Sequence, residues 1–350
     1  MQALSPERFR GEIDGKAVRL YTLRNASGMV CCITNYGAKI VQLLVPDRNG
    51  QLGDVVLGYD SLQGVVGGSP SMGAFIGRYA GRIGNAAFTL AGVHHKLTAI
   101  NGPHCLHGGI QGSQFRVFDA AQNNPSSVEM RYLFADGEEG FPGTLALSLM
   151  VSLTDANELV LDYEATALDK PTVASFTTHA FFNLNGHASG SVLDHQVTVF
   201  ADQQFGMTDD LIATGEMLAV AGTRFDFQEP RAINAWGQGD YDCCFALNKP
   251  APNQLSLAAQ VSAHTSGRVM RVWSTEPAMQ FYTGLLPNEP LTGGPGKEGA
   301  RYMQQQSLCL EPQGYPNAPK LMHSYPKAAS AVYTPGESRA GKTLYRFSNY

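Results

Sequence analysis

Strict alternation of apolar and polar positions constrains the fold of this chain more than any other feature of its sequence. Apolar residues occupy every second position at 145–153, 159–165 and 128–134, and most positions between them are polar or small. Such a period of two places one row of side chains on each face of a strand. Turn-forming sequences at 136–143 and 154–157 separate the three segments. The pattern predicts an antiparallel meander of half-buried strands.

Strand patterns recur along the rest of the chain, and no window keeps a helical period for more than about two turns. The further expected strands are 17–24, 29–35, 39–45, 192–201, 268–275, 278–283 and 306–311. The 38 glycines and 19 prolines are spread throughout, as many short turns require. We therefore predict an all-β fold, a large antiparallel β-sandwich with few short helices. No linker divides it, so residues 1–350 are expected to form a single domain with a long surface loop at 286–300.

Composition and charge exclude several classes of partner. The net charge is −5 without any basic run, which argues against nucleic acid and anionic membranes and leaves neutral, hydroxyl-rich ligands open. No apolar stretch approaches the ~20 residues of a membrane span, and the N-terminal residues lack the apolar core of a signal peptide. The six cysteines form no CxxC pair, so we expect reduced thiols in a cytoplasmic protein.

A histidine and a carboxylate in strand patterns are the strongest candidates for chemistry. Glu311 shares the small, polar face of its strand with Cys309, and Pro312 is expected to end that strand. His179 is expected to share a face with Phe181 and Asn183. An imidazole and a carboxylate can move two protons on one small molecule, although each alone could be a satisfied structural group. Their mutual attraction would favour anionic Glu311 and protonated His179.

Other polar residues could line the same site. Arg82 lies in a glycine-rich segment, where it could contact a ligand or be solvated at a turn, and Asp242 could bind hydroxyl groups or cap a turn. His104 and His107 flank Cys105. With His179 and Glu311 these histidines could in principle hold a metal. We predict no metal site, since the spacing matches no recognised set of ligands.

The ordered set of motifs resembles the aldose 1-epimerase (galactose mutarotase) family. The matching segments are 77–83 (Gly-Arg-Tyr-Ala-Gly-Arg-Ile), 106–109 (Leu-His-Gly-Gly), 178–184 (Thr-His-Ala-Phe-Phe-Asn-Leu), 240–242 (Asp-Tyr-Asp), 280–284 (Gln-Phe-Tyr-Thr-Gly) and 310–311 (Leu-Glu). The resemblance implies a β-supersandwich whose cleft binds a free aldose such as galactose or glucose. It further implies that no cofactor is needed; the chain would be a monomer or homodimer.

The resemblance also assigns roles to individual residues. Glu311 would be the general base that takes the proton of the anomeric hydroxyl, and His179 the general acid that protonates the ring oxygen. The residues expected to orient the sugar are Arg82, His107, Asp242 and Gln280. The chain departs from the family pattern in two places: Gly81 replaces a common asparagine, and Asn317 and Lys320 replace a common aspartate and asparagine, which changes the charge beside the cleft. These departures leave the preferred sugar open.

Three alternative functions remain compatible with the sequence. A hexose-6-phosphate 1-epimerase would need a cationic cluster, which Arg78, Arg82 and Lys320 could supply. A non-catalytic carbohydrate-binding or sensing protein would keep the cleft but would not need a poised acid and base. A glycoside hydrolase would use two carboxylates, and Asp242 with Glu311 is the pair we would nominate.

Overall fold

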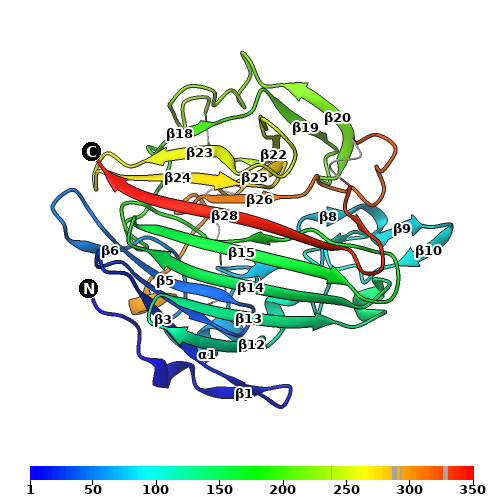
Figure 1. Ribbon diagram of the computed structural model, residues 1–350. Helices are drawn as coiled ribbons and strands as arrows, with labels where there is room; N and C mark the ends of the chain where they lie inside the picture. The colour runs from blue at the N-terminus through cyan, green and yellow to red at the C-terminus, as the bar shows by residue number, and fades with distance from the viewer. Residues whose placement is uncertain (238, 286–289, 292–293, 326–329) are drawn as a thin grey trace.

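A nine-stranded antiparallel sheet dominates the computed structural model, which describes residues 1–237, 239–285, 290–291, 294–325 and 330–350. This sheet spans the front of Figure 1. In spatial order its strands are β12 (Asp119–Asn124), β13 (Ser127–Phe134), β14 (Leu145–Thr154), β15 (Glu158–Ala167), β28 (Ser338–Asn349), β24 (Arg268–Ser274), β23 (Ser256–Ser262), β18 (Gln196–Val199) and β21 (Arg231–Ala232). The predicted meander is confirmed as β13, β14 and β15, because neighbouring strands pair antiparallel in chain order.

Two smaller antiparallel sheets accompany the large one. The five-stranded sheet has the order β20 (Ala213–Ala219), β19 (Gln203–Met207), β22 (Asp242–Ala246), β25 (Ala278–Tyr282) and β26 (Cys309–Gln313). The four-stranded sheet has the order β3 (Leu20–Arg24), β4 (Val30–Thr34), β5 (Lys39–Pro46) and β6 (Leu52–Asp54). Five short pairs complete the strands: β1 (Gly11–Ile13) with β2 (Lys16–Val18), β7 (Phe75–Ile76) with β17 (Thr177–Thr178), β8 (Arg82–Ile83) with β11 (Cys105–Leu106), β9 (Ala87–Leu90) with β10 (Val93–Lys96), and β16 (Thr172–Val173) with β27 (Val332–Tyr333).

The inner face of the large sheet forms one continuous core with both smaller sheets. Leu149 of β14 belongs to the same buried cluster as Ile33 of β4 and Leu310 of β26. Truncating one such leucine to alanine typically costs about 2–5 kcal/mol. The sandwich architecture predicted from the alternation is therefore confirmed, and its core fixes where β26 presents its other face.

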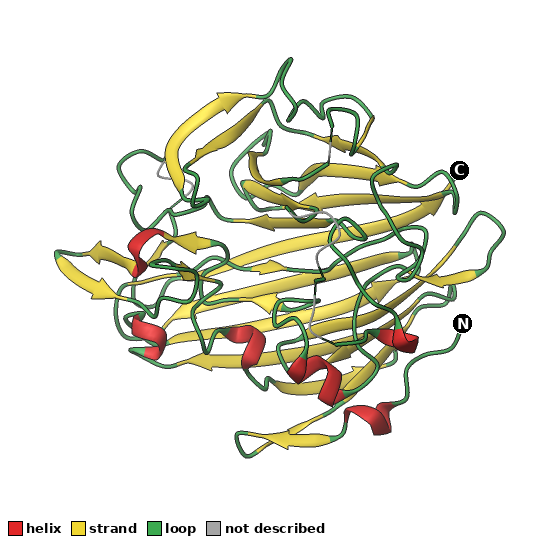
Figure 2. Ribbon diagram, turned by 180° about the vertical axis from the view of Figure 1, so that it is seen from behind, coloured by secondary structure: helices red, strands yellow, loops and turns green. Residues whose placement is uncertain are grey.

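Helices contribute little to this fold. Within the described part of the chain the single α-helix is α1 (Leu62–Gly67), and five 3₁₀ turns complete the helical residues. Figure 2 shows these turns scattered among the loops rather than forming a layer. No helix of the described residues is long and apolar enough to cross a membrane. The prediction of few short helices is confirmed.

Three sequence predictions need correction. The segment 17–24 is divided at Arg19 into β2 and β3, and the segment 192–201 contains only the short β18. Pro312 does not end its strand, because β26 continues to Gln313. β26 is the outer strand of its sheet, where a residue without an N–H is tolerated.

The expected surface loop at 286–300 is also wrong in part. Lys297 is buried and forms an ion pair with Asp54, and its ammonium also donates to the carbonyl oxygens of Val41 and Val56 at 2.8 and 2.7 Å. This end of the segment is therefore anchored in the interior. Residues 286–289 and 292–293 lie outside the described residues.

Candidate active site

A cleft of about 410 Å³ brings the predicted site residues together. It lies on the face of the five-stranded sheet opposite to the one that packs into the main core, and residues of the β8–β11 pair and of the segment that follows β17 also line it. All six residues proposed from the sequence line it, namely Arg82, His107, His179, Asp242, Gln280 and Glu311. The six side chains therefore share one cleft, as the sequence led us to expect. Their individual roles are proposals.

Strand register places three of these residues on one face of the sheet. Gln280 of β25 lies opposite Glu311 of β26, and Tyr282 lies opposite Asp242 of β22. Directly paired residues share a face, and so do residues two apart on one strand. The Gln280 amide donates a hydrogen bond to Asp242. These three residues thus present two carboxylates and one amide to the cleft.

His179 is held by backbone hydrogen bonds immediately after β17. Its N–H donates to the carbonyl of Ala74 at 2.8 Å, and its carbonyl accepts from the N–H of Gly73 at 2.9 Å. Gly73 has a φ of +75°, and a Cβ there would lie 2.2 Å from the carbonyl oxygen of Ile40, so only glycine fits this turn. The His179 ring stacks on Phe181 with centroids 4.9 Å apart. The predicted shared face of these two residues is confirmed.

His179 and Glu311, which come from distant parts of the chain, meet in the cleft. His179 Nε2 lies 3.6 Å from Glu311 Oε1, slightly too far for a hydrogen bond. Both side chains are buried, with 7% and 2% of their surfaces exposed. A group bound between these two atoms could therefore exchange protons with both.

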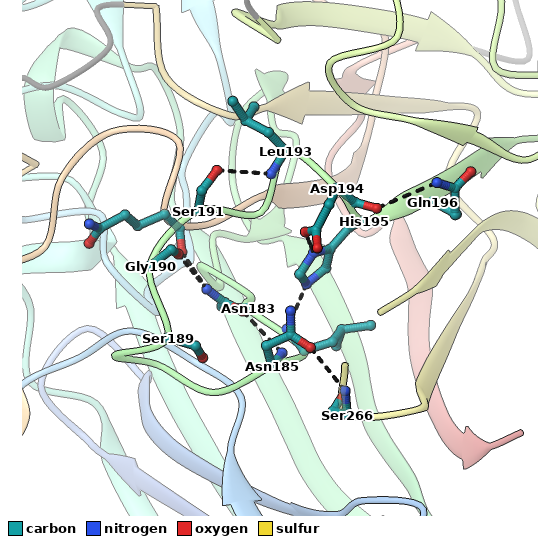
Figure 3. A network of polar contacts seen from close by, with 12 residues as sticks. Asn183, Asn185, Ser189, Gly190, Ser191, Leu193, Asp194, His195, Gln196 and Ser266 are labelled. Atoms are coloured by element: carbon teal, nitrogen blue, oxygen red, sulfur yellow. Dashed lines mark hydrogen bonds and ion pairs between the residues drawn. The ribbon is translucent and has the colours of Figure 1, made fainter. Parts of the chain in front are cut away.

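Asn183, which was expected to share the face of His179, is fully buried and serves a different purpose. Its side-chain amide donates to the carbonyls of Gly190 and Gln306 at 2.8 and 3.0 Å, and its Oδ1 accepts from the N–H of Asn185 at 3.0 Å. Figure 3 shows this network. The amide links the segment after His179 to the segment that leads into β26.

Two further contacts fix the same junction. The backbone of Phe182 exchanges two hydrogen bonds with Leu308, at 2.8 and 2.9 Å. His195 accepts the N–H of Leu184 on Nε2 at 3.2 Å, and its Nδ1 lies 3.2 Å from the Asp194 carboxylate (Figure 3). This histidine and aspartate resemble a catalytic dyad, but the backbone bond occupies Nε2. The network sets the spacing between the His179 and Glu311 segments.

Arg82 reaches the cleft from the β8–β11 pair. Its Nε donates to Asn101 Oδ1 at 3.0 Å, and one terminal nitrogen lies 3.9 Å from Asp242 Oδ2. Arginine stays protonated at every physiological pH, so it can stabilise charge and bind hydroxyl groups but cannot serve as an acid. It therefore partly compensates the two carboxylates of the sheet.

His107 lies beside His179 and is fixed in one tautomer. Its Nδ1 accepts the backbone N–H of Gly81 at 3.2 Å, so the proton of a neutral ring is on Nε2. The rings of His107 and His179 are nearly perpendicular, with centroids 5.3 Å apart. Burial, with the nearby charges of His179 and Arg82, lowers the pKa of His107 well below its usual value. The ring is a neutral hydrogen-bond donor.

Burial also determines the protonation of the central pair, and here the expectation from the sequence is wrong. Burial raises the pKa of Glu311 well above 4.5; the charge of Asp242 raises it further, and Arg82 opposes the shift. Burial lowers the pKa of His179 to about 4. Loss of water outweighs the mutual attraction because each charged form loses its hydration and the two groups share no hydrogen bond. Both residues therefore resist ionisation in the empty cleft.

Three other sequence candidates lie outside the cleft. Arg78 is buried and donates to the carbonyls of Pro142 and Gly143, and the Lys320 ammonium donates to the carbonyl of Gly84 at 3.1 Å. His104 accepts a backbone N–H on Nδ1 and does not line the cleft either. Of the cations that could have bound a phosphate, the described cleft contains only Arg82.

Sequence reasoning missed part of the lining. Tyr282 on β25 and Gln313 on β26 each lie two residues after a predicted site residue and therefore share its face. The alternation of the strands could have identified both. Gly81 faces Gln313, and a Cβ on Gly81 would lie 3.5 Å from the Gln313 side-chain nitrogen. The cleft lining also includes the apolar residues Met207, Leu211, Leu285 and Leu291. No periodic signal marks these residues, since they come from separate loops and strand ends.

A deep, partly polar cleft with a buried acid–base pair on a β-sandwich defines a protein built for proton transfer on a small, hydroxyl-rich molecule. Comparison with known proteins gives the family: the model of the family "Aldose 1-epimerase" matches residues 19–346. This chain belongs to the aldose 1-epimerase family. The resemblance seen in the sequence is confirmed.

Named relatives agree along most of the chain. The galactose mutarotase of Bos taurus is 38% identical over 320 residues, which is 90% of each protein. The aldose 1-epimerase of Escherichia coli (strain K12) is 32% identical over 342 residues, covering 95% of this chain and 96% of that protein. A crystal structure of an aldose epimerase homologue from C. elegans superposes with a TM-score of 0.86 at 27% identity, covering 95% of this chain and 99% of that one. The β-supersandwich expectation is confirmed.

Proposed function

We propose that this protein interconverts the α and β anomers of a free aldose by opening and closing the sugar ring. The observation that carries the proposal is the buried pair of His179 and Glu311, with Nε2 and Oε1 separated by 3.6 Å inside the cleft. Membership of the aldose 1-epimerase family and relatives named galactose mutarotase support the same activity.

The reaction needs one proton removed and one supplied. The Glu311 carboxylate takes the proton of the anomeric hydroxyl while protonated His179 gives a proton to the ring oxygen, and the C1–O5 bond breaks. The aldehyde end rotates about the C1–C2 bond. Return of both protons by the reverse steps closes the ring on the other face. The pair holds one proton before and after ring opening, so it is regenerated without any other reactant.

The remaining cleft residues bind and orient the sugar. His107 offers a neutral donor and Arg82 a cationic one, while Asp242 and Gln280 present oxygen and nitrogen atoms from neighbouring strands. Alternating donors and acceptors suit a ring of hydroxyl groups. The proposed steps use side chains alone.

The same observations bear on the alternatives and on the organisation of the chain. A 6-phosphate substrate is disfavoured because Arg78 and Lys320 bind backbone carbonyls away from the cleft. A binding protein would not need the buried pair. We also propose that residues 1–350 form one domain, since the family match runs from 19 to 346 and residues from Ser69 to Pro316 build a single cleft.

The test is polarimetry of freshly dissolved α-D-galactose and α-D-glucose with wild type and Glu311→Gln. We expect Glu311→Gln to lose about 10²–10⁴-fold in kcat while sugar binding stays measurable, because glutamine keeps the shape but cannot accept the proton. His179→Asn should lose rate to a similar extent. Near-wild-type turnover of Glu311→Gln would remove Glu311 as the base.

Glu276→Gln is a matched control for that experiment. Burial raises the pKa of Glu276 as it does for Glu311, but Glu276 accepts a hydrogen bond from the Tyr163 hydroxyl and does not line the cleft. Turnover of this variant should equal wild type. Comparable losses in both variants would indicate damage to the fold rather than loss of a base.

A further inference from the structure

A third potential ligand atom lies beside the acid–base pair. Cys309 precedes Glu311 by two residues on β26, so both side chains share the face that meets His179. One ligand atom from each of Cys309, Glu311 and His179 lies within 4.8 Å of the other two, and all three residues are buried. The proposed sugar chemistry gives the thiol no role.

The three atoms are the donor set that zinc and cadmium prefer. A thiolate sulfur, an imidazole nitrogen and a carboxylate oxygen occur together in zinc sites, at about 2.3, 2.0–2.1 and 2.0–2.2 Å from the ion. Two such nitrogen and oxygen ligands on a tetrahedral ion lie about 3.4 Å apart by that geometry. The observed 3.6 Å between His179 Nε2 and Glu311 Oε1 is already close to this spacing. The sulfur would have to approach by about 1 Å, within reach of a side-chain rotation.

We propose that His179, Cys309 and Glu311 form an inhibitory binding site for a thiophilic divalent cation such as Zn²⁺ or Cd²⁺. The ion takes the place of the anomeric end of the sugar, with three protein ligands and a fourth position open to the cleft. Binding uses both proposed proton-transfer groups and displaces two protons to solvent, one from the Cys309 thiol and one from the Glu311 carboxyl group. Affinity should therefore rise with pH.

As ligands of the ion, Glu311 and Cys309 would each carry one negative charge. A dication compensates both negative charges at once, whereas the sugar compensates neither fully. The inference rests on the same His179 and Glu311 as the proposed function, but it concerns binding and is measured without turnover.

The experiment is a titration of the whole protein with CdCl₂, followed by calorimetry and by ultraviolet absorption of the cadmium–thiolate bond. Wild type should bind one ion per chain with a new absorption band, and galactose should weaken the binding. Cys309→Ala should lose the band and lose affinity by at least about 10–100-fold, the cost of removing even an outer partner of a metal site. It should also remain active and become insensitive to the ion.

Cys244→Ala is the matched control. Cys244 is equally buried on β22, which lies two strands from β26 in the same sheet, but it is not one of the three clustered ligands. This variant should bind cadmium as wild type does. The proposal is overturned if wild type binds no ion stoichiometrically, if Cys309→Ala binds with wild-type affinity, or if a sugar that the protein turns over does not compete with the ion. These binding results do not depend on whether Glu311 proves to be the base.

Discussion

Lys39 is a buried cation whose ionisation should destabilise the scaffold of the cleft. It is 1% exposed at the start of β5, with its ammonium 4.8 Å from the centre of the Tyr36 ring. Burial lowers the pKa of Lys39 from 10.5 to about 7. The next residue, Ile40, donates its N–H to Gly73, which in turn donates to the carbonyl of His179. The unfavourable free energy of this buried charge therefore acts close to His179.

Lys39→Met keeps the length of the side chain and removes the charge. Each unit by which the pKa of Lys39 is lowered corresponds to about 1.4 kcal/mol of unfolding free energy. The full change from 10.5 to about 7 therefore destabilises the fold by about 5 kcal/mol when the lysine is protonated in both states. At pH 7 the folded lysine is half protonated, which leaves about 4 kcal/mol. Loss of the contact with the Tyr36 ring offsets about 1–2 kcal/mol of this. We expect Lys39→Met to raise the free energy of unfolding by about 2–3 kcal/mol at pH 7.

The sign of the pH dependence follows from the lowered pKa. Between about pH 7 and 10.5 the unfolded chain binds more protons than the folded one, so wild-type stability from this group rises with pH. The advantage of Lys39→Met should therefore shrink over this range and disappear above it. Below pH 7 the advantage should stay at its maximum, because both states of the wild type are protonated.

Urea unfolding of wild type and Lys39→Met at pH 7 and pH 9.5 measures both effects. Lys96→Met is the control, since Lys96 is exposed on β10 and its replacement should change stability little at either pH. A variant that is no more stable than wild type at pH 7 would refute the reasoning. An equal gain in the free energy of unfolding at pH 7 and pH 9.5 would also refute it.

Two further predictions concern the cleft. Asp242→Asn removes a charge that raises the pKa of Glu311. The alkaline limb of the pH profile of kcat/KM should therefore move to lower pH. An unmoved limb would show that Asp242 does not shift the pKa values of His179 and Glu311. Gly81→Asn restores an amide beside Gln313 at a φ of +78°, which asparagine tolerates. One added hydrogen bond of about 1 kcal/mol should change the ratio of kcat/KM for galactose and glucose about fivefold. An unchanged ratio would exclude contact between residue 81 and the hydroxyl that distinguishes them.

The strands that the sequence predicted well are those with one solvent-facing side and one buried side. β13, β14 and β15 show clean alternation because solvent covers their outer side. β4 is buried along its whole length, so its period carries less information. Lys297 could not have been placed inside, because the carboxylate that compensates it, Asp54, is 243 residues away in sequence.

Positions in the cleft were predictable, and their energetics were not. His179 and Glu311 belong to short motifs that identify them individually. Their protonation depends on burial, which is a sum over neighbours from many segments and has no local signal. Asn183 was noticed for the face it shares with His179, yet its actual partners are carbonyl groups 7 and 123 residues away. A buried amide of this kind is visible only after the chain has folded.

Burial of the pair also explains why one site can serve both directions of the reaction. If Glu311 and His179 kept their ordinary pKa values of 4.5 and 6.5, a single proton shared by the pair would favour the imidazole by about 2.7 kcal/mol. Burial raises the pKa of Glu311 and lowers the pKa of His179. This removes the preference for the imidazole and disfavours the state with an anionic Glu311 and a cationic His179. In the proposed mechanism, the two one-proton states of the pair are the start and the end of ring opening. Hydroxyl groups of a bound sugar can hydrogen-bond to the charged state, so the ligand itself restores the balance that permits proton transfer either way.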